Sequence, residues 1–405
     1  MVYIQHKKIN QYELFSGGKL TLLHIDIELT ERCNNNCIHC YINQPQNDPV
    51  TKSREMSTDF VKSVLLQAAE LGSLSVRFTG GEPLLREDFQ ELYIFARHLG
   101  MRVILFTNAT MITQELCQLF SRIPPGKPIS ITVYGMHASS YDAIVARKGA
   151  FDEFWHGINL LQKYNIPFEV KQSLLPQNQS EIPEFEAFVA TLPNMHYEPG
   201  YSMNFDLRAR RDNSAKNSII KGLRVSPQET LAMLTRDPEK YVKEMRKFAS
   251  KFMGHPDDRL FSCGAGLETC VDAYGIAQMC MLLRHPDTVY PLNPESHQKR
   301  HPDIELKPLK YALTKFFPRV RQQRSRNPDY LNRCARCFLM GLCDQCPAKS
   351  WEEHGTLDTP VEYLCEIAHA KARFLGLINE GEKAWELEEE IWKARLNNFI
   401  SDSKS

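Results

Sequence analysis

The sequence of 405 residues lacks a long apolar run, an excess of one charge and an export signal. No stretch approaches the roughly 18 apolar residues that a membrane-spanning helix needs. Lysine plus arginine and aspartate plus glutamate both number 49, which argues against a polycation that binds nucleic acid and against an acidic tail. The N-terminus does not place a basic segment before an apolar one, so we expect a cytoplasmic protein.

Internal repeats and low-complexity segments are also lacking. The hydrophobic content of 42% and the charged content of 24% are those of an ordinary globular protein, and the length suits roughly two or three domains. Cysteine is the residue type that stands out, with twelve in the chain. Without an export signal, so many cysteines favour metal sites over disulfides.

The first three cysteines, Cys33, Cys37 and Cys40, have the spacing C-x3-C-x2-C directly after the strand-like stretch 22–29. Three thiolates on one short loop, here called the cysteine loop (residues 33–41), can bind three irons of a cubic 4Fe–4S cluster. Such a cluster normally has four cysteine ligands, so its fourth iron would be open to another molecule. The alternative is a zinc loop or a set of buried structural cysteines.

This loop resembles the signature of the radical SAM (S-adenosylmethionine) superfamily. The resemblance implies that the open iron chelates the amino and carboxyl groups of SAM's methionine, and that Tyr41 lies beside the adenine. A second motif of the family follows the strand-like stretch 74–79, and it is implied to bind the methionine amino group. It consists of Gly80, Gly81, Glu82 and Pro83.

Eight more cysteines lie between Cys263 and Cys365. Their order resembles the SPASM domain, whose pattern is C…G-x4-C…C-x2-C-x5-C-x3-C…C, except that two residues instead of three separate Cys343 from Cys346. The resemblance implies two auxiliary 4Fe–4S clusters, and therefore three clusters in all; a pair of zinc sites is the alternative. Auxiliary cluster I would use Cys263, Cys270, Cys280 and Cys346, and auxiliary cluster II would use Cys334, Cys337, Cys343 and Cys365. Only Cys117 is left over, and we expect it to be an ordinary buried thiol.

Strand-like and helix-like stretches alternate from about residue 22 to residue 205, which predicts an α/β protein with a parallel sheet and helices outside it. Among them we expect strands at 102–107 and near 201–207, and helices at 182–190 and at 57–71, the latter with Ser57 as its N-cap. The family implies a partial (β/α)6 barrel followed by the cysteine-rich SPASM domain. The expected division of the chain is an N-terminal extension (1–20), the barrel (21–211), a helical bridge (212–260), the SPASM domain (261–370) and a C-terminal helix (371–405).

Polar residues near strand ends are candidates for SAM contacts, because barrel enzymes place their chemistry there. Asn108 and Thr132 occupy such positions, although each could merely cap a strand or turn. Lys171 lies in the middle of a predicted strand and could face the barrel interior. One of Arg208, Arg210 and Arg211 could pair with SAM's carboxylate, since arginine binds carboxylates bidentately.

These features predict a SPASM-type radical SAM enzyme that activates a C–H bond in a peptide or small protein, with a crosslink as the product. A low-potential donor, flavodoxin or ferredoxin, would supply electrons. The first predicted strand begins at Leu22, so we expect either the barrel or a separate protein to recognise the peptide.

Three other functions stay open. Sulfatase-type formylglycine formation is disfavoured, because that branch typically has Asp after the G-x4-C cysteine and this chain has Met281. Tetrapyrrole or quinone-cofactor synthesis uses the same domains. A non-catalytic iron–sulfur electron carrier is disfavoured by the open-site loop and the glycine motif.

Overall fold

The computed structural model describes residues 22–195, 199–254, 256–300 and 307–401. The predicted N-terminal extension and the last four residues of the predicted C-terminal helix lie outside this part. The chain forms two compact units. The first contains the residues up to Leu223 together with Gly264–Val320, and the second contains Arg224–Cys263 together with the residues from Arg321. The predicted segment 261–370 is therefore shared between the two units.

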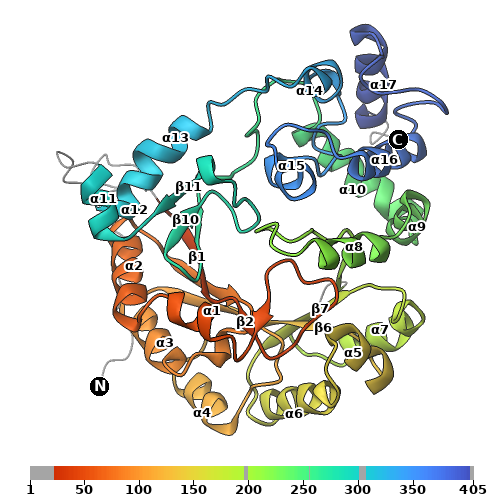
Figure 1. The fold of residues 1–405 in the computed structure, drawn as a ribbon. Coiled ribbons are helices and arrows are strands. Elements are labelled where there is room, and N and C mark those ends of the chain that lie inside the picture. Colours follow the sequence, from red (N-terminus) through yellow and green to blue (C-terminus); the bar gives the residue numbers. More distant parts are fainter. Residues whose placement is uncertain (1–21, 196–198, 255, 301–306, 402–405) are drawn as a thin grey trace. The chain divides into compact units, whose positions relative to one another are not determined.

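The first unit is built around six parallel strands in the order of the chain, as a partial (β/α)6 barrel requires. Figure 1 shows helices outside this sheet. The prediction of the fold class is confirmed. The strands are β1 (His24–Thr30), β4 (Ser75–Gly80), β5 (Arg102–Thr107), β6 (Ile129–Val133), β7 (Phe168–Ser173) and β8 (Gly200–Ser202), and a separate short pair consists of β2 (Arg32–Cys33) and β3 (Gln44–Pro45).

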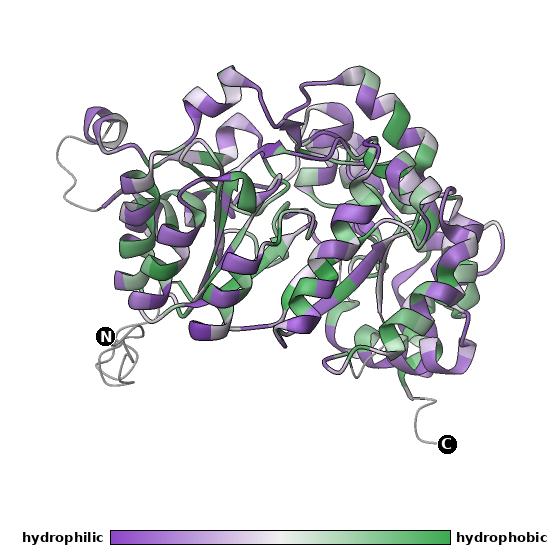
Figure 2. Cartoon of the chain, turned by 90° about the horizontal axis from the view of Figure 1, so that it is seen from below, coloured by the Kyte–Doolittle hydropathy of each residue, from purple (hydrophilic) through white to green (hydrophobic). Residues whose placement is uncertain are grey.

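The helices of the first unit are amphipathic, with apolar residues packed inward and hydrophilic residues outward (Figure 2). In α2, the Ser57 side chain caps the first turn by accepting a hydrogen bond from the Phe60 N–H. The helices are α1 (Pro49–Arg54), α2 (Thr58–Glu70), α3 (Phe89–His98), α4 (Gln114–Arg122), α5 (Ala138–Val145), α6 (Ala150–Lys163), α7 (Ile182–Ala190), α8 (Ser214–Leu223), α11 (Pro294–Arg300), α12 (Pro308–Tyr311) and α13 (Phe317–Val320), with the π-helical turn η6 (Ala312–Phe316) and the 3-10 turns η3 (Pro83–Leu85), η4 (Gln179–Glu181) and η5 (Pro286–Thr288).

A small antiparallel addition extends the barrel sheet beyond β1. Strand β9 (Thr269–Val271) pairs with β1 in parallel and places Cys270 opposite Asp26. Strand β10 (Ile276–Gln278) pairs antiparallel with β9, and β11 (Val289–Pro291) pairs antiparallel with β10. Part of the cysteine-rich region is thus joined to the barrel by backbone hydrogen bonds.

The second unit is mostly helical and has its own hydrophobic core, in which Phe338 stacks on Trp392 with ring centroids 5.3 Å apart. Its elements are α9 (Pro227–Leu234), α10 (Pro238–Phe252), α14 (Pro328–Asn332), η7 (Cys334–Arg336), α15 (Pro347–His354), α16 (Glu362–Phe374) and α17 (Glu389–Ser401). In neither unit is any described helix long and apolar enough to cross a membrane.

Two elements differ from the sequence-based expectation. The expected strand 201–207 is only Gly200–Ser202, because Phe205 and Leu207 pack with α8 in irregular backbone instead. Helix α5 was not predicted, since its first turn, Ala138-Ser139-Ser140, looks like a loop.

Candidate active site

A cavity of about 360 Å³ opens at the carboxyl ends of the barrel strands, and all of its lining residues belong to the first unit. Its size falls within the usual range for small-molecule sites. Residues from the cysteine loop and from each of the six strands or the turns that follow them meet there. The predicted site residues that line it are Cys33, Cys37, Cys40, Tyr41, Gly80, Gly81, Asn108 and Thr132.

The three thiols of the cysteine loop lie close enough to affect one another, and those of Cys33 and Cys37 are shielded from water. Burial, with a smaller contribution from Cys40, raises the pKa of Cys37 to about 12. Burial also raises the pKa of Cys33, and Cys37 adds to that effect. Three thiolates this close together need positive charge between them, which iron ions would supply. The residues present therefore fit an iron–sulfur cluster held by the loop.

The two glycines of the second motif approach the chain's own backbone. The Gly81 N–H donates to the Thr30 carbonyl over 2.8 Å, and the Glu82 N–H donates to the Arg32 carbonyl over 2.9 Å. A Cβ atom on Gly80 would lie 2.1 Å from the Thr30 carbonyl oxygen, and one on Gly81 would lie 2.2 Å from that of Arg32. Only glycine permits this contact, so the motif holds the segment that leads into the cysteine loop.

Glu82 and Pro83 do not line the cavity. The Glu82 carboxylate is fully buried and accepts hydrogen bonds from the Thr107 hydroxyl (2.9 Å) and from the backbone N–H groups of Asn108 (2.8 Å) and Leu84 (3.1 Å). Burial raises its pKa to about 7, although the hydrogen bonds act in the opposite direction. Glu82 thus fixes the end of β5, where the Asn108 amide donates to Asn34 of the cysteine loop over 2.9 Å.

Some lining residues were not singled out from the sequence. Ser130, Tyr134, Ser173 and Phe205 line the cavity together with Lys171, whose inward direction was anticipated. The signal that could have found Ser130 is the alternation of side chains along a strand, because it lies two residues before Thr132 on β6. His39 also lines the cavity, and burial lowers its pKa to about 3.

Met281 is the lining residue that the C-terminal region contributes. It follows Cys280 directly, at the position where the sulfatase-maturing branch is expected to carry an acidic base. Its sulfur lies 3.9 Å from the Arg77 guanidinium. The side chain at this position faces the cavity, and a thioether cannot serve as a base at neutral pH.

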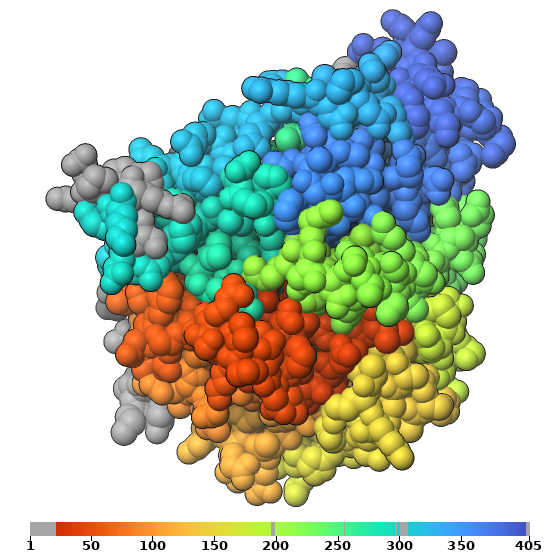
Figure 3. Space-filling model, viewed as in Figure 1, coloured from red at the N-terminus to blue at the C-terminus, as the bar shows by residue number. Residues whose placement is uncertain are grey.

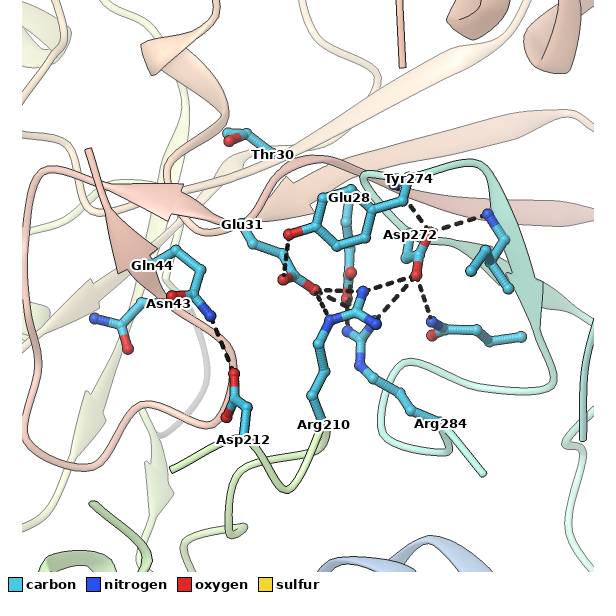
Figure 4. Close-up of polar contacts among 12 residues, drawn as sticks. Glu28, Thr30, Glu31, Asn43, Gln44, Arg210, Asp212, Asp272, Tyr274 and Arg284 are labelled. Carbon is cyan, nitrogen blue, oxygen red and sulfur yellow. Dashed lines mark hydrogen bonds and ion pairs between the residues drawn. The ribbon is translucent and has the colours of Figure 1, made fainter. Parts of the chain in front are cut away.

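The arginines considered as partners for SAM's carboxylate do not line the cavity. Arg208 pairs with Asp212 over 2.8 Å. Arg210 joins a buried ion network, in which it contacts Glu31 (2.7 Å) and Asp272 (2.8 Å), as Figure 4 shows. Arg211 is exposed.

The same network continues deeper into the first unit. The Arg284 guanidinium donates to both oxygens of Glu28 (2.7 and 2.9 Å), and the Tyr274 hydroxyl donates to Glu31 over 2.9 Å (Figure 4). It ties β1 and the residues before the cysteine loop to the β9–β10 addition. Burial raises the pKa of Glu28 to about 7, although Arg284 lowers it.

Helix α8 and the residues just before it contact the cysteine loop and Asn43, which follows the loop. The Lys216 ammonium donates to the Asn43 side chain over 2.6 Å, and the Ala209 N–H donates to the Tyr41 carbonyl over 3.1 Å. Figure 3 shows the surface of this stretch directly against that of the residues near 40. The loop is therefore held on both sides by contacts distant in sequence.

The cysteines expected to hold auxiliary cluster II gather within the second unit. Burial raises the pKa of all four thiols, to about 12 for Cys334 and Cys337, and Cys365 raises that of the other three further. For the cluster I set, Cys270 and Cys280 belong to the first unit, whereas Cys263 and Cys346 belong to the second. Cys117 is buried on α4, as expected.

In the part of the chain that the structure describes, no three His, Cys, Asp or Glu side chains are grouped as ligands of a single metal ion. A tetrahedral zinc site would need its thiolates at about 2.3 Å from one ion. A cubic cluster instead spreads its cysteines over separate irons.

The comparisons with known proteins agree with this site. The model of the radical SAM superfamily matches residues 27–189. The AdoMet-dependent heme synthase of Methanosarcina barkeri is 32% identical over 155 residues, which are 38% of this chain and 43% of the relative. The chain thus matches less than half the length of that relative. The subtilosin biosynthesis protein AlbA of Bacillus subtilis is 24% identical over 323 residues, which are 79% of this chain and 68% of AlbA.

Among solved structures, SuiB of Streptococcus suis has been determined with S-adenosylmethionine bound and also with its precursor peptide SuiA bound. The S-adenosylmethionine complex superposes with a TM-score of 0.57 at 14% identity, over 82% of this chain and 75% of SuiB. At that identity the likeness establishes the fold. With the family match and the cavity at the strand ends, residues 27–189 of this chain form a radical SAM domain.

Proposed function

We propose that this enzyme cleaves SAM reductively and uses the resulting 5′-deoxyadenosyl radical to activate a C–H bond in a ribosomally made peptide, giving a crosslink. The convergence of the cysteine loop, the glycine pair and polar strand-end residues on one cavity carries this proposal. The loop thiols would hold the catalytic 4Fe–4S cluster, which supplies the electron for SAM cleavage when it is present. This chain's residues would bind SAM and the peptide and exclude water.

Within the cavity, we assign SAM to the side formed by the cysteine loop and the glycines. Tyr41 would lie against the adenine, and Asn108 and Thr132 would contact the ribose. Pro83 and Glu82 would act indirectly, because Glu82 holds the ends of β4 and β5 through buried hydrogen bonds.

The eight C-terminal cysteines would hold two fully ligated auxiliary clusters that move electrons. Other thiols of the set raise the pKa of Cys334, Cys337 and Cys343, so these thiols and Cys365 lie close together. This closeness supports the set for auxiliary cluster II. Cluster I, with Cys263, Cys270, Cys280 and Cys346, rests on the sequence pattern. We further propose a flavodoxin or ferredoxin as donor, a cytoplasmic location and, where the barrel does not suffice, a separate peptide-recognition protein.

A peptide substrate is supported by the relative AlbA, which is named for biosynthesis of the bacteriocin subtilosin. Met281 supports a crosslink over formylglycine formation as the outcome. The thioether in the cavity removes the base that formylglycine formation requires. Porphyrin chemistry is the second candidate, because the heme synthase relative is 32% identical over 155 residues.

The test uses anaerobically reconstituted enzyme, SAM, a reductant and the precursor peptide encoded nearest to its gene. We expect 5′-deoxyadenosine and a peptide lighter by two hydrogens, about 2 Da, with the fragments between the joined residues missing in tandem mass spectra. An aldehyde that reacts with a hydrazide would support formylglycine formation instead. Decarboxylation of iron coproporphyrin III without any change in the peptide would favour the porphyrin reaction.

A further inference from the structure

Lys171 places a positive charge inside the cavity. It lies on β7, level with Thr132 of β6, and lines the cavity. Its ammonium lies 4.4 Å from the centre of the Phe106 ring, so the lysine reaches across β6 toward β5. Among the described residues, no carboxylate forms an ion pair with it, and no hydrogen bond to its ammonium is present.

A second cation lies next to the same ring. The Arg77 guanidinium is 4.7 Å from the centre of Phe106 and forms an ion pair with Asp26 over 3.2 Å. Asp26 also accepts a hydrogen bond from His24 over 2.9 Å. The charge of Arg77 is therefore matched inside the barrel, whereas that of Lys171 is not.

The charges around Lys171 do not favour keeping an ammonium there. Burial lowers its pKa, Arg77 lowers it further, and Glu169 raises it. A partly buried cation beside a second cation is costly unless an anion reaches it. A cation over an aromatic ring recovers only part of this cost. Asp206 is the carboxylate among the described lining residues of the cavity, and it forms no ion pair with Lys171. The cavity thus leaves a place beside Lys171 for a negative group of a ligand.

We propose that Lys171 binds a carboxylate of the substrate, namely an aspartate or glutamate side chain of the peptide close to the residue that is modified. This inference rests on the proposed function, since it names a feature of that substrate. Arg77, held by Asp26, positions the Phe106 ring that supports the lysine. Lys171 thereby sets which part of an acidic peptide lies at the reacting end of the cavity.

The direct test measures the acetylation rate of lysines in the reconstituted holoenzyme with a neutral N-hydroxysuccinimide ester, followed by peptide mass spectrometry. Acetyl-Ala-Glu-Ala-amide at about 10 mM should slow acetylation of Lys171 at least about threefold, a change expected for millimolar binding. The matched peptide with Gln in place of Glu should leave the acetylation rate of Lys171 unchanged. Lys163 is the internal control, because it is exposed and lies 5.9 Å from the Tyr164 ring centre.

Three results would overturn the inference. Equal rates with the Glu and Gln peptides would mean that Lys171 binds no carboxylate. Protection of Lys171 by SAM alone would assign the carboxylate to SAM. Protection by coproporphyrin III at about 10 µM, without protection by the peptide, would assign it to a porphyrin propionate.

A second measurement uses turnover of the precursor peptide. Lys171→Met should raise KM for the peptide at least about tenfold, because a charge-assisted hydrogen bond is lost. Lys171→Arg should return KM most of the way to the wild-type value, and Lys163→Met should leave KM unchanged. A normal KM in Lys171→Met would contradict the inference while the crosslink itself still formed. If no crosslink forms in the wild type, the proposed function fails, and the acetylation experiment still decides the role of Lys171.

Discussion

Arg284 offers a sharp test of how the barrel and the β9–β10 addition are held together. Its side chain is 2% exposed, and the carboxylates of Glu28, Glu31 and Asp272 that face it are fully buried. Arg284→Met keeps much of the volume of the side chain and removes its charge. Glu28 then loses both of its short hydrogen bonds, at 2.7 and 2.9 Å.

The expected loss in the free energy of unfolding is about 3 kcal/mol at neutral pH. Breaking a buried ion pair by removing one partner typically costs about 3–5 kcal/mol. We use the lower end of that range because the pKa of Glu28 is already about 7, so its carboxylate is easily protonated at neutral pH. Without Arg284, which lowers that pKa, Glu28 would take up a proton rather than stay charged.

Urea unfolding of the anaerobic holoenzyme, followed by far-ultraviolet circular dichroism, measures this loss. Lys52→Met is the control, since Lys52 and Glu87 form an exposed pair in the same unit. Such pairs contribute less than about 1 kcal/mol. The double variant Glu28→Gln, Arg284→Met should recover at least about half of the loss, because no charge stays unpaired at that position.

Equal stabilities of Arg284→Met and Lys52→Met would refute this reasoning. So would a double variant that is less stable than Arg284→Met, because the two changes would then act independently of the Glu28–Arg284 pair.

Three further outcomes are expected. The reconstituted protein should contain about 12 Fe and about 12 sulfide per chain, falling to about 8 Fe when the loop cysteines are all replaced by Ala; tightly bound zinc with one cluster would rule out the auxiliary assignment. Glu82→Ala should weaken SAM binding at least about tenfold at normal iron content, and Glu82→Gln should weaken it less, since its carbonyl can still accept some of the hydrogen bonds. Wild-type SAM affinity of both variants in equilibrium dialysis would mean that Glu82 does not position the SAM site. Because the folded-state pKa of Glu28 is raised to about 7 from 4.5, its contribution to stability is present below pH 4.5 and is lost as the pH rises through 7. The stability of Glu28→Gln relative to the wild type should therefore increase from pH 5 to pH 8, and a constant difference would contradict the raised pKa.

Local patterns in the sequence predicted the barrel well. Strand β5 and helix α7 have the bounds expected from the sequence, and Ser57 caps α2 as expected. These elements depend on side-chain periodicity and capping, which neighbouring residues determine. The expected strand after Tyr201 failed because Phe205 and Leu207 pack against a helix that follows them.

The candidate site was predictable only where a motif marks it. The cysteine loop and the glycine pair were found because their spacing is unusual. The inward direction of Glu82 was not, since it depends on three donors that reach it only in the folded chain. The pairing of Glu28 with Arg284 joins residues more than 250 positions apart, and neither residue has a local signal for such a partner.

The pairing of β9 with β1 has a consequence for synthesis of the chain on the ribosome. Thr269 hydrogen-bonds beside Ile25 in this sheet, roughly 240 residues later in the chain. At about 5–20 residues per second, β1 has an open edge for roughly 12–50 s after it leaves the ribosome. An unpaired strand edge invites pairing with other chains. The nascent protein therefore has a long interval in which a chaperone, or the machinery that inserts clusters, can reach the strand that leads into the cysteine loop.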